Sequence, residues 1–263
     1  MSSRSEEKRR LREEREARER AREQSARMRR RLQLLGALAA AAVVVVVVVI
    51  VASGGGGSKK ANLTEPPTGA AEVSARFSGI PQNGTALGNP KAPVTLLEFA
   101  DLKCPVCRDY TLKVFPQLVD RYVRTGKVRM VMEMQDFVAN QDNDSEHAAR
   151  MALAAGMQNR LWQFADLFYL NQQDEATTYV NDAFLRHIGS GVRGLNVDRA
   201  LSERDSSQIT QQLQQALSLY NTGGFTGTPS FAVGKTDGTM QPIGSGLLPA
   251  SEISGAIDKL LPK

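Results

Sequence analysis

The sequence predicts an α/β domain in which a block of helices interrupts a small mixed sheet, preceded by an N-terminal membrane-spanning segment. Three observations support this prediction. Strand and helix periodicities alternate from about residue 76, residues 145–220 are patterned as helix, and residues 32–52 form one long apolar run. The chain of 263 residues therefore divides into unequal parts, and only the C-terminal part can bury a core.

The net charge of +5 belongs entirely to the N-terminus. Residues 1–35 hold 13 Lys/Arg and 7 Asp/Glu, a balance of +6, so the other 20 basic and 21 acidic residues sum to −1. Because the basic excess lies beside the apolar run and not on the globular part, we expect no nucleic-acid partner. Residues 1–31 are predicted to be a cytoplasmic charged tail, either a solvated helix or disordered.

Residues 32–52 are predicted to be a single transmembrane helix. Gln33 is the only strongly polar residue among them, and the run is long enough to span a hydrocarbon core of about 30 Å. The basic triplet 29–31 before it predicts a cytoplasmic N-terminus and an extracytoplasmic C-terminal domain. A cleaved signal peptide is the alternative, since the small residues Ala52 and Ser53 follow the run. The length of the run favours a retained anchor, followed by a flexible linker over residues 53–75.

The folded domain is predicted over residues 76–263. Asn83-Gly84 indicates a hairpin between residues 77–80 and 86–87, and residues 94–100 form a short apolar run typical of a buried strand. A helix from Pro105 and a strand over 127–134 complete a strand-helix-strand unit, which implies a parallel pair. The helix should bury Tyr110, Val114, Leu118 and Tyr122, with a distortion at Pro116.

Three or four helices are predicted in an insertion over about residues 140–222. Residues 230–233 and 240–243 should then form a strand pair, and residues 251–261 a closing helix. Met130, Met132 and Met134 alternate along one strand face and are predicted to fill the core.

Cys104 and Cys107 are the only cysteines, and the two residues between them make a loop too small for a stabilising bridge. The other candidate zinc ligands are His147 and His187, forty residues apart on separate predicted helices. We therefore expect neither a metal nor a cofactor, and no role for either histidine. The cysteine pair is better explained as redox chemistry.

The position of the pair favours that chemistry, because it falls where a strand ends and a helix begins. Pro105 suits the first helical turn, so backbone N–H groups and the helix dipole point at Cys104 and favour its thiolate. Lys103 adds a nearby positive charge, taken to be exposed. We predict that Cys104 attacks and forms the mixed disulfide, and that the better buried Cys107 resolves it.

Two further residues stand out. Glu98 interrupts an apolar strand, where a carboxylate is costly to bury, and is interpreted as a proton acceptor or donor for Cys107, with a hydrated edge position as the alternative. Pro229 precedes an apolar run and marks the first residue of a strand, since proline supplies no ladder N–H. Composition alone predicts a trans bond before Pro229.

The stretch Leu97-Glu98-Phe99-Ala100-Asp101-Leu102-Lys103-Cys104-Pro105-Val106-Cys107 resembles the active site of DsbA-like thioredoxin-fold proteins. The hairpin before it and Gly227-Thr228-Pro229-Ser230-Phe231 after it fit the same pattern. The resemblance covers about residues 76–263 and is strongest to membrane-tethered members from Gram-positive bacteria. It implies a thioredoxin fold with a helical insertion.

The resemblance also implies roles for single residues. It implies a cis bond between Thr228 and Pro229 beside the cysteines, with extended clients pairing with the backbone of Thr228. Glu98 occupies the family's buried acidic position. Lys103, Pro105 and Val106 complete the active-site loop, and Val106 departs from the histidine of the most oxidising members.

The leading functional hypothesis is an extracytoplasmic oxidase that passes the Cys104–Cys107 disulfide to the thiols of secreted or membrane client proteins. A membrane quinone-linked partner would reoxidise it. The first alternative reverses the chemistry, so that the domain reduces or isomerises client disulfides. The second is a tethered binding module in which the bridge is inert and no reaction is catalysed.

Overall fold

The structure is a computed structural model that describes residues 65–138 and 143–262. The predicted tail (1–31), the predicted membrane segment (32–52) and most of the predicted linker (53–64) lie outside these residues. None of the helices within the described residues combines the length and the hydropathy that a membrane span requires.

The described residues form one six-stranded sheet in the order β1-β2-β4-β3-β5-β6. The central strands β3 (Val94–Ala100) and β4 (Val128–Met134) are parallel, as the strand-helix-strand pattern predicted. The other pairs are antiparallel and join β1 (Gln82–Asn83), β2 (Ala86–Leu87), β5 (Ser230–Lys235) and β6 (Gln241–Ser245). Strand β3 is therefore flanked on both sides, and its carboxyl end opens onto residues 101–104.

The helix predicted from Pro105 is divided into three parts. Helix α3 (Pro105–Lys113) ends at Val114, α4 (Phe115–Leu118) follows, and a π-helical turn covers Val119–Val123. The break lies two residues before Pro116, whose ring cannot continue the hydrogen-bond ladder of a helix. The four positions predicted to be buried are all 8% exposed or less: Tyr110, Val114, Leu118 and Tyr122.

The start of the domain differs from the prediction. Helix α2 (Ala70–Arg76) occupies residues assigned to the linker, and its Val73 is buried. Phe77 ends this helix instead of beginning a strand, so the first hairpin strand is β1. The turn itself lies where Asn83-Gly84 predicted it, with Gly84 at a positive φ of 59°.

The insertion holds five helices within the described residues, more than the three or four predicted. They are α5 (Asp144–Gly156), α6 (Leu161–Leu170), α7 (Asp182–Ser190), α8 (Val197–Glu203) and α9 (Ser207–Thr222). Two asparagines divide the second half, because the side chain of Asn181 caps α7 and that of Asn196 caps α8. The chain closes with α10 (Ala250–Asp258).

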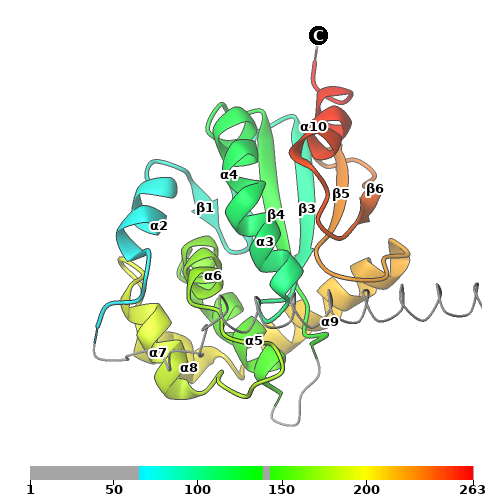
Figure 1. Cartoon of the computed structure of the whole chain (residues 1–263). Helices are drawn as coiled ribbons and strands as arrows, with labels where there is room; N and C mark the ends of the chain where they lie inside the picture. The colour runs from blue at the N-terminus through cyan, green and yellow to red at the C-terminus, as the bar shows by residue number, and fades with distance from the viewer. Residues whose placement is uncertain (1–64, 139–142, 263) are drawn as a thin grey trace, which may run out of the picture. The chain divides into compact units, whose positions relative to one another are not determined.

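Both faces of the sheet are covered. Figure 1 shows α3 and α4 in front of the sheet, with α5 to α8 gathered at one side. On one face the ring of Tyr110 packs on Phe231, and on the other Phe99 contacts Tyr220. The methionines Met130, Met132 and Met134 are buried in the core, as predicted. The end of β3 is thus fixed by packing on both sides.

Candidate active site

Cys104 occupies the N-cap of α3, where β3 passes through a short loop into the helix. Its backbone is extended, with φ −70° and ψ 120°, and Pro105 takes the first helical position. This placement matches the prediction. It directs the unpaired N–H groups of the first helical turn, including those of Val106 and Cys107, at the sulfur.

These surroundings lower the pKa of the Cys104 thiol to about 6. The largest cause is a hydrogen bond from the thiol of Cys107, which outweighs the opposing effect of burial; Thr228 and the backbone N–H groups of Cys107 and Val106 add to it. Cys104 is 8% exposed, so most of the residue is covered. A large fraction is therefore thiolate at neutral pH.

Cys107 is fully buried, one turn into α3. Burial and the neighbouring Cys104 raise the pKa of the Cys107 thiol well above its usual range. The two sulfurs therefore differ strongly in proton affinity: that of Cys104 is held as a thiolate, and that of Cys107 is a fully buried thiol that donates a hydrogen bond to it. This asymmetry agrees with the predicted roles of attacking and resolving cysteine.

The bond between Thr228 and Pro229 is cis. The family resemblance implied this, whereas composition alone predicted a trans bond. The sulfur of Cys104 lies 3.3 Å from the Thr228 carbonyl oxygen, to which its protonated form donates, so the loop before β5 lies against the cysteines. Pro229 is buried, and Ser230 begins β5 as predicted. The hydroxyl of Ser230 donates to the Gly227 carbonyl oxygen, and this hydrogen bond stabilises the loop that contains Thr228 and Pro229.

Val106 is the exposed member of the active-site loop. Its side chain is 39% exposed, which places an apolar group on the surface between the two cysteines. Pro105 is exposed as well. The surface beside Cys104 is therefore uncharged at these two residues.

Lys103 does not act as the prediction assumed. Its side chain is completely buried and points into the helical insertion, where Nζ donates to Asp144 at 3.1 Å and to the Thr177 carbonyl oxygen at 2.7 Å. It also lies over the ring of Tyr179, 4.9 Å from the centroid. Because Nζ is engaged there, Lys103 ties the loop to the insertion and does not supply an exposed charge beside Cys104.

Two residues that hold the loop were missed. The buried carboxylate of Asp101 accepts from the N–H groups of Lys103 and Val138, both at 2.8 Å, and from the Ser145 hydroxyl. Gln172 donates to the carbonyl oxygens of Leu102 and Cys104. Asp101 follows the buried strand directly, which could have drawn attention to it, whereas the sequence around Gln172 contains no such signal.

Glu98 is buried in the centre of β3, 1% exposed, so the alternative of a hydrated edge position is wrong. Burial, and secondarily the charge of Asp166, raises the pKa of its carboxyl to about 8. Tyr110 and Tyr169 lie close enough to both Glu98 and Cys107 to feel the charge of each. Glu98 therefore holds its proton at neutral pH, and the same two tyrosines lie near both this carboxyl group and the buried thiol.

His147 is exposed and His187 is buried on α7. The two histidines remain on separate helices, α5 and α7, as predicted. Within the part of the chain that the structure describes, no group of three or more His, Cys, Asp or Glu side chains is arranged to hold a metal ion.

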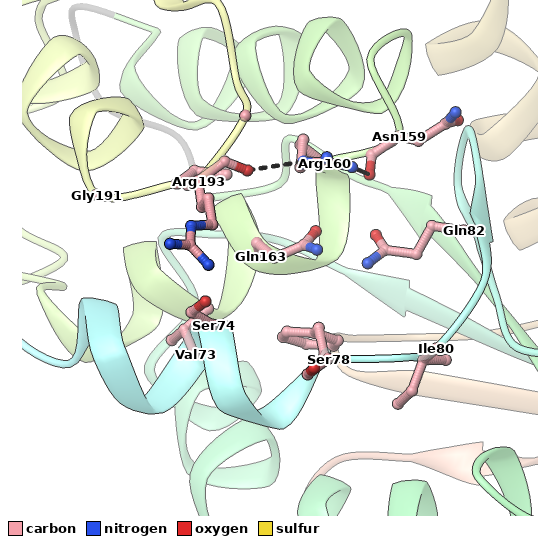
Figure 2. A pocket seen from close by; sticks show the side chains of 13 residues that line it. Val73, Ser74, Ser78, Ile80, Gln82, Asn159, Arg160, Gln163, Gly191 and Arg193 are labelled. Atoms are coloured by element: carbon pink, nitrogen blue, oxygen red, sulfur yellow. Dashed lines mark hydrogen bonds between the residues drawn. The ribbon is translucent and has the colours of Figure 1, made fainter.

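A polar cavity of about 410 Å³ lies elsewhere, between α2, the start of α6 and residues 191–194. Figure 2 shows Arg160, Arg193, Gln82 and Gln163 around it. No thiol lines this cavity, so the chemistry of the cysteine pair is not located there.

The model of the thioredoxin family matches residues 81–258. Among curated proteins, "Probable disulfide bond formation protein D" of Bacillus anthracis is 28% identical over 131 residues, 49% of this chain and 60% of the relative. "Putative protein-disulfide oxidoreductase" of Rickettsia felis is 30% identical over 184 residues, 69% of this chain and 62% of the relative. The matches thus span about 60% of the length of these relatives.

Solved structures are similar as well. BdbD of Bacillus subtilis in the oxidised form superposes with a TM-score of 0.58 at 20% identity, over 68% of this chain and 96% of that one, which shows a shared fold. A thioredoxin-like oxidoreductase of Silicibacter pomeroyi gives a TM-score of 0.51 at 27% identity, over 72% of this chain and 95% of that one.

Proposed function

Because the chain belongs to the thioredoxin family, we propose that it is a thiol-disulfide oxidoreductase that introduces disulfides into client proteins through Cys104 and Cys107. The observation that supports this most strongly is the low pKa of Cys104, about 6, beside a buried neutral Cys107. Curated relatives named for disulfide bond formation support the oxidising direction.

The reaction starts from the Cys104–Cys107 disulfide. A client thiolate attacks the sulfur of Cys104, a mixed disulfide forms there, and Cys107 leaves. Because the pKa of Cys107 is high, the leaving sulfur takes a proton, which protonated Glu98 can supply. A second client thiolate then attacks the client sulfur of the mixed disulfide and releases Cys104 as its thiolate. The client loses two electrons, and the cysteine pair gains them.

Release of Cys104 is favoured by the same groups that lower its pKa. A sulfur that is stable as an anion is a good leaving group, so the helix N-terminus and the hydrogen bond from Cys107 favour transfer of the disulfide to the client. The reduced pair must then be reoxidised, and a membrane quinone-linked partner is the proposed acceptor of its electrons.

The proposed location is the outer face of a bacterial cell membrane. The basic triplet before the apolar run 32–52 supports a single-pass anchor with a cytoplasmic N-terminus. Free thiols of secreted or membrane proteins would then be the substrates, since disulfides persist in oxidising compartments. The membrane-tethered type within the family is part of this proposal.

Val106 favours a second candidate, reduction or isomerisation of client disulfides at the same site. The valine adds no positive charge beside Cys104, so its thiolate lacks one stabilising partner. A reduction potential well below about −200 mV, measured against a glutathione buffer, would favour this candidate over the oxidase. A non-catalytic binding module has less support, because the cysteines differ so strongly in proton affinity.

Trapping in cells tests the function. In a Cys107→Ala variant the mixed disulfide at Cys104 cannot be resolved, so client proteins should accumulate on this variant and be released by reductant. Cys104→Ala, with Cys107 intact but buried, is the matched control and should trap none. If both variants trap equally little while the chain is folded, the oxidoreductase function is wrong.

A further inference from the structure

Glu98 has an unusual environment for a buried carboxyl group. Neither of its oxygens has a hydrogen-bond partner among the described residues. A cavity of about 10 Å³ adjoins it, with Thr111 of α3 and Asp166 of α6 in its lining. Room of this size between polar groups suits about one water molecule.

Asp166 is the second buried carboxyl group of this cavity, and its side chain is 2% exposed. Both of its oxygens accept from Nη1 of Arg76, at 2.7 and 2.6 Å. Arg76 is 14% exposed and reaches Glu72 at the surface with its other nitrogen. Asp166 therefore lies between the buried Glu98 and the partly solvated ion pair that Arg76 forms with Glu72.

The groups around Glu98 provide no positive charge in direct contact. Helix α3 contributes Tyr110 and Thr111, and helix α6 contributes Asp166 and Tyr169. The remaining neighbours are apolar: Met132 of β4, Phe115 of α4, Trp162 and Ala165 of α6, and Phe231 paired on β5. Arg76 pairs with Asp166, and no Lys or Arg among the described residues lines the cavity.

We propose that one water in this cavity bridges Glu98 and Asp166, and that Asp166 is a positioning residue whose charge keeps the proton on Glu98. At neutral pH the two carboxyl groups would then hold one proton between them. That proton is on Glu98, while Asp166 stays anionic and paired with Arg76. This inference deepens the proposed function and rests on it, because the proton that Glu98 keeps is the one that the leaving sulfur of Cys107 takes up.

The proton affinities agree with this arrangement. Burial and the charge of Asp166 raise the pKa of Glu98 to about 8. Burial raises the pKa of Asp166 to about 6, and the ion pair with Arg76 limits the rise. At pH 7 the proton therefore resides on the inner of the two carboxyl groups.

The step balances as a proton transfer. As Cys107 leaves the disulfide, Glu98 gives its proton to the sulfur and becomes a carboxylate, while Cys107 becomes a neutral thiol. The bridging water then faces two carboxylates, a state of high energy in a buried site. Glu98 consequently regains a proton from solvent before the next cycle, and the like charge of Asp166 favours that return.

Titration of the Glu98 carboxyl by carbon-13 NMR in the purified full chain tests the inference without any client. Removing the like charge in Asp166→Asn should lower the pKa of Glu98 by on the order of one pH unit. Asp182→Asn, which removes an exposed partner of Arg204, is the matched control and should leave it unchanged. An unchanged Glu98 titration in folded Asp166→Asn would overturn the proposal.

Thr111→Val is a second variant, nearly isosteric and without a change of charge. Thr111 lines the cavity, and the proposal assigns its hydroxyl as a third partner of the bridging water. Loss of this hydroxyl removes support from the Glu98 carboxylate, so the pKa of Glu98 should rise, opposite to Asp166→Asn. A Glu98 titration that Thr111→Val leaves unmoved would rule out the water bridge even if Asp166→Asn fails to fold.

The pH profile of disulfide exchange provides the readout for the function. Oxidised Asp166→Asn should react with reduced glutathione as fast as the unmodified chain near pH 5. At pH 8 it should be slower by roughly fivefold, as a one-unit shift requires. If Asp166→Asn and the unmodified chain react at equal rates at pH 8 as well as at pH 5, the role of Asp166 is refuted. If the unmodified chain does not exchange at all, the proposed function fails, whereas the Glu98 titration still decides the inference.

Discussion

Cys104 and Thr228 are separated by 124 positions in the sequence, yet the sulfur of Cys104 lies 3.3 Å from the carbonyl oxygen of Thr228. The contact joins the end of β3 to the start of β5, two strands paired side by side in the sheet. It places the peptide group of Thr228 at the sulfur that a client must reach. A client strand bound to Thr228 would therefore already lie beside Cys104.

The titration of Cys104 is the first prediction. In the reduced chain, alkylation of Cys104 by iodoacetamide should increase with pH with a midpoint near 6, because the thiolate is the reactive form. Cys107→Ala removes the largest stabilising hydrogen bond, so the midpoint should move upward. Thr228→Val, which loses only the hydroxyl, should move it less. A midpoint near that of a free thiol in the unmodified chain would contradict the site described above.

The pH dependence of stability is the second prediction. Because the pKa of Glu98 is raised in the folded state, its contribution to stability is present below the unfolded pKa and is lost as pH rises through about 8. Glu98→Gln should therefore gain stability relative to the unmodified chain between pH 5 and pH 9, by on the order of 4 kcal/mol. Urea unfolding of the oxidised protein at several pH values measures it.

The control for that experiment is Glu252→Gln, which changes an exposed glutamate on α10. Between pH 5 and pH 9 the stability difference from the unmodified chain should change far more for Glu98→Gln than for this exposed position. A constant difference for Glu98→Gln would mean that Glu98 titrates like a solvated carboxyl group.

Lys103 is the subject of the third prediction. Lys103→Met removes the buried ion pair between Lys103 and Asp144 and should lower the free energy of unfolding by about 3–5 kcal/mol. The titration of Cys104 should not change, since Nζ points into the insertion. Lys113→Met, which breaks an exposed pair with Asp109, should cost less than about 1 kcal/mol. A rise in the Cys104 pKa without loss of stability would restore the role first expected of Lys103.

The central strand and the helix that follows it could be predicted from the sequence, because the hydrophobic periodicity and the positions of the prolines indicated the same boundaries. Residues 94–100 are apolar except for Thr95 and Glu98 and lie between Pro93 and Asp101, and β3 covers the same residues. Pro105 marked the start of α3, and Pro116 the region of its break. In each case the backbone restriction of a proline and the burial of apolar side chains favour the same element boundary.

Other features depended on tertiary contacts that no local pattern encodes. Helix α2 contains one buried apolar residue, Val73, so its seven residues resemble a linker until α6 packs against them. Lys103 is long and charged, which predicts exposure, but Asp144 lies 41 positions away and provides its partner. Glu98 was identified as a site residue, but Asp166 was not. Asp166 lies beside Glu98 only in the folded domain, because the two residues are distant in the sequence.

Substitution of the exposed Val106 gives the last prediction. Val106→His places an imidazole at the second position of α3, next to the sulfur of Cys104. Its protonated form should stabilise the thiolate, lower the pKa of Cys104 by about one pH unit, and make the disulfide correspondingly more oxidising. Val106→Asn, polar but uncharged, separates this charge effect from a change in polarity. Equilibration of each variant with a glutathione buffer measures the potential, and equal potentials for the histidine and asparagine variants would show that charge at this position does not tune the site.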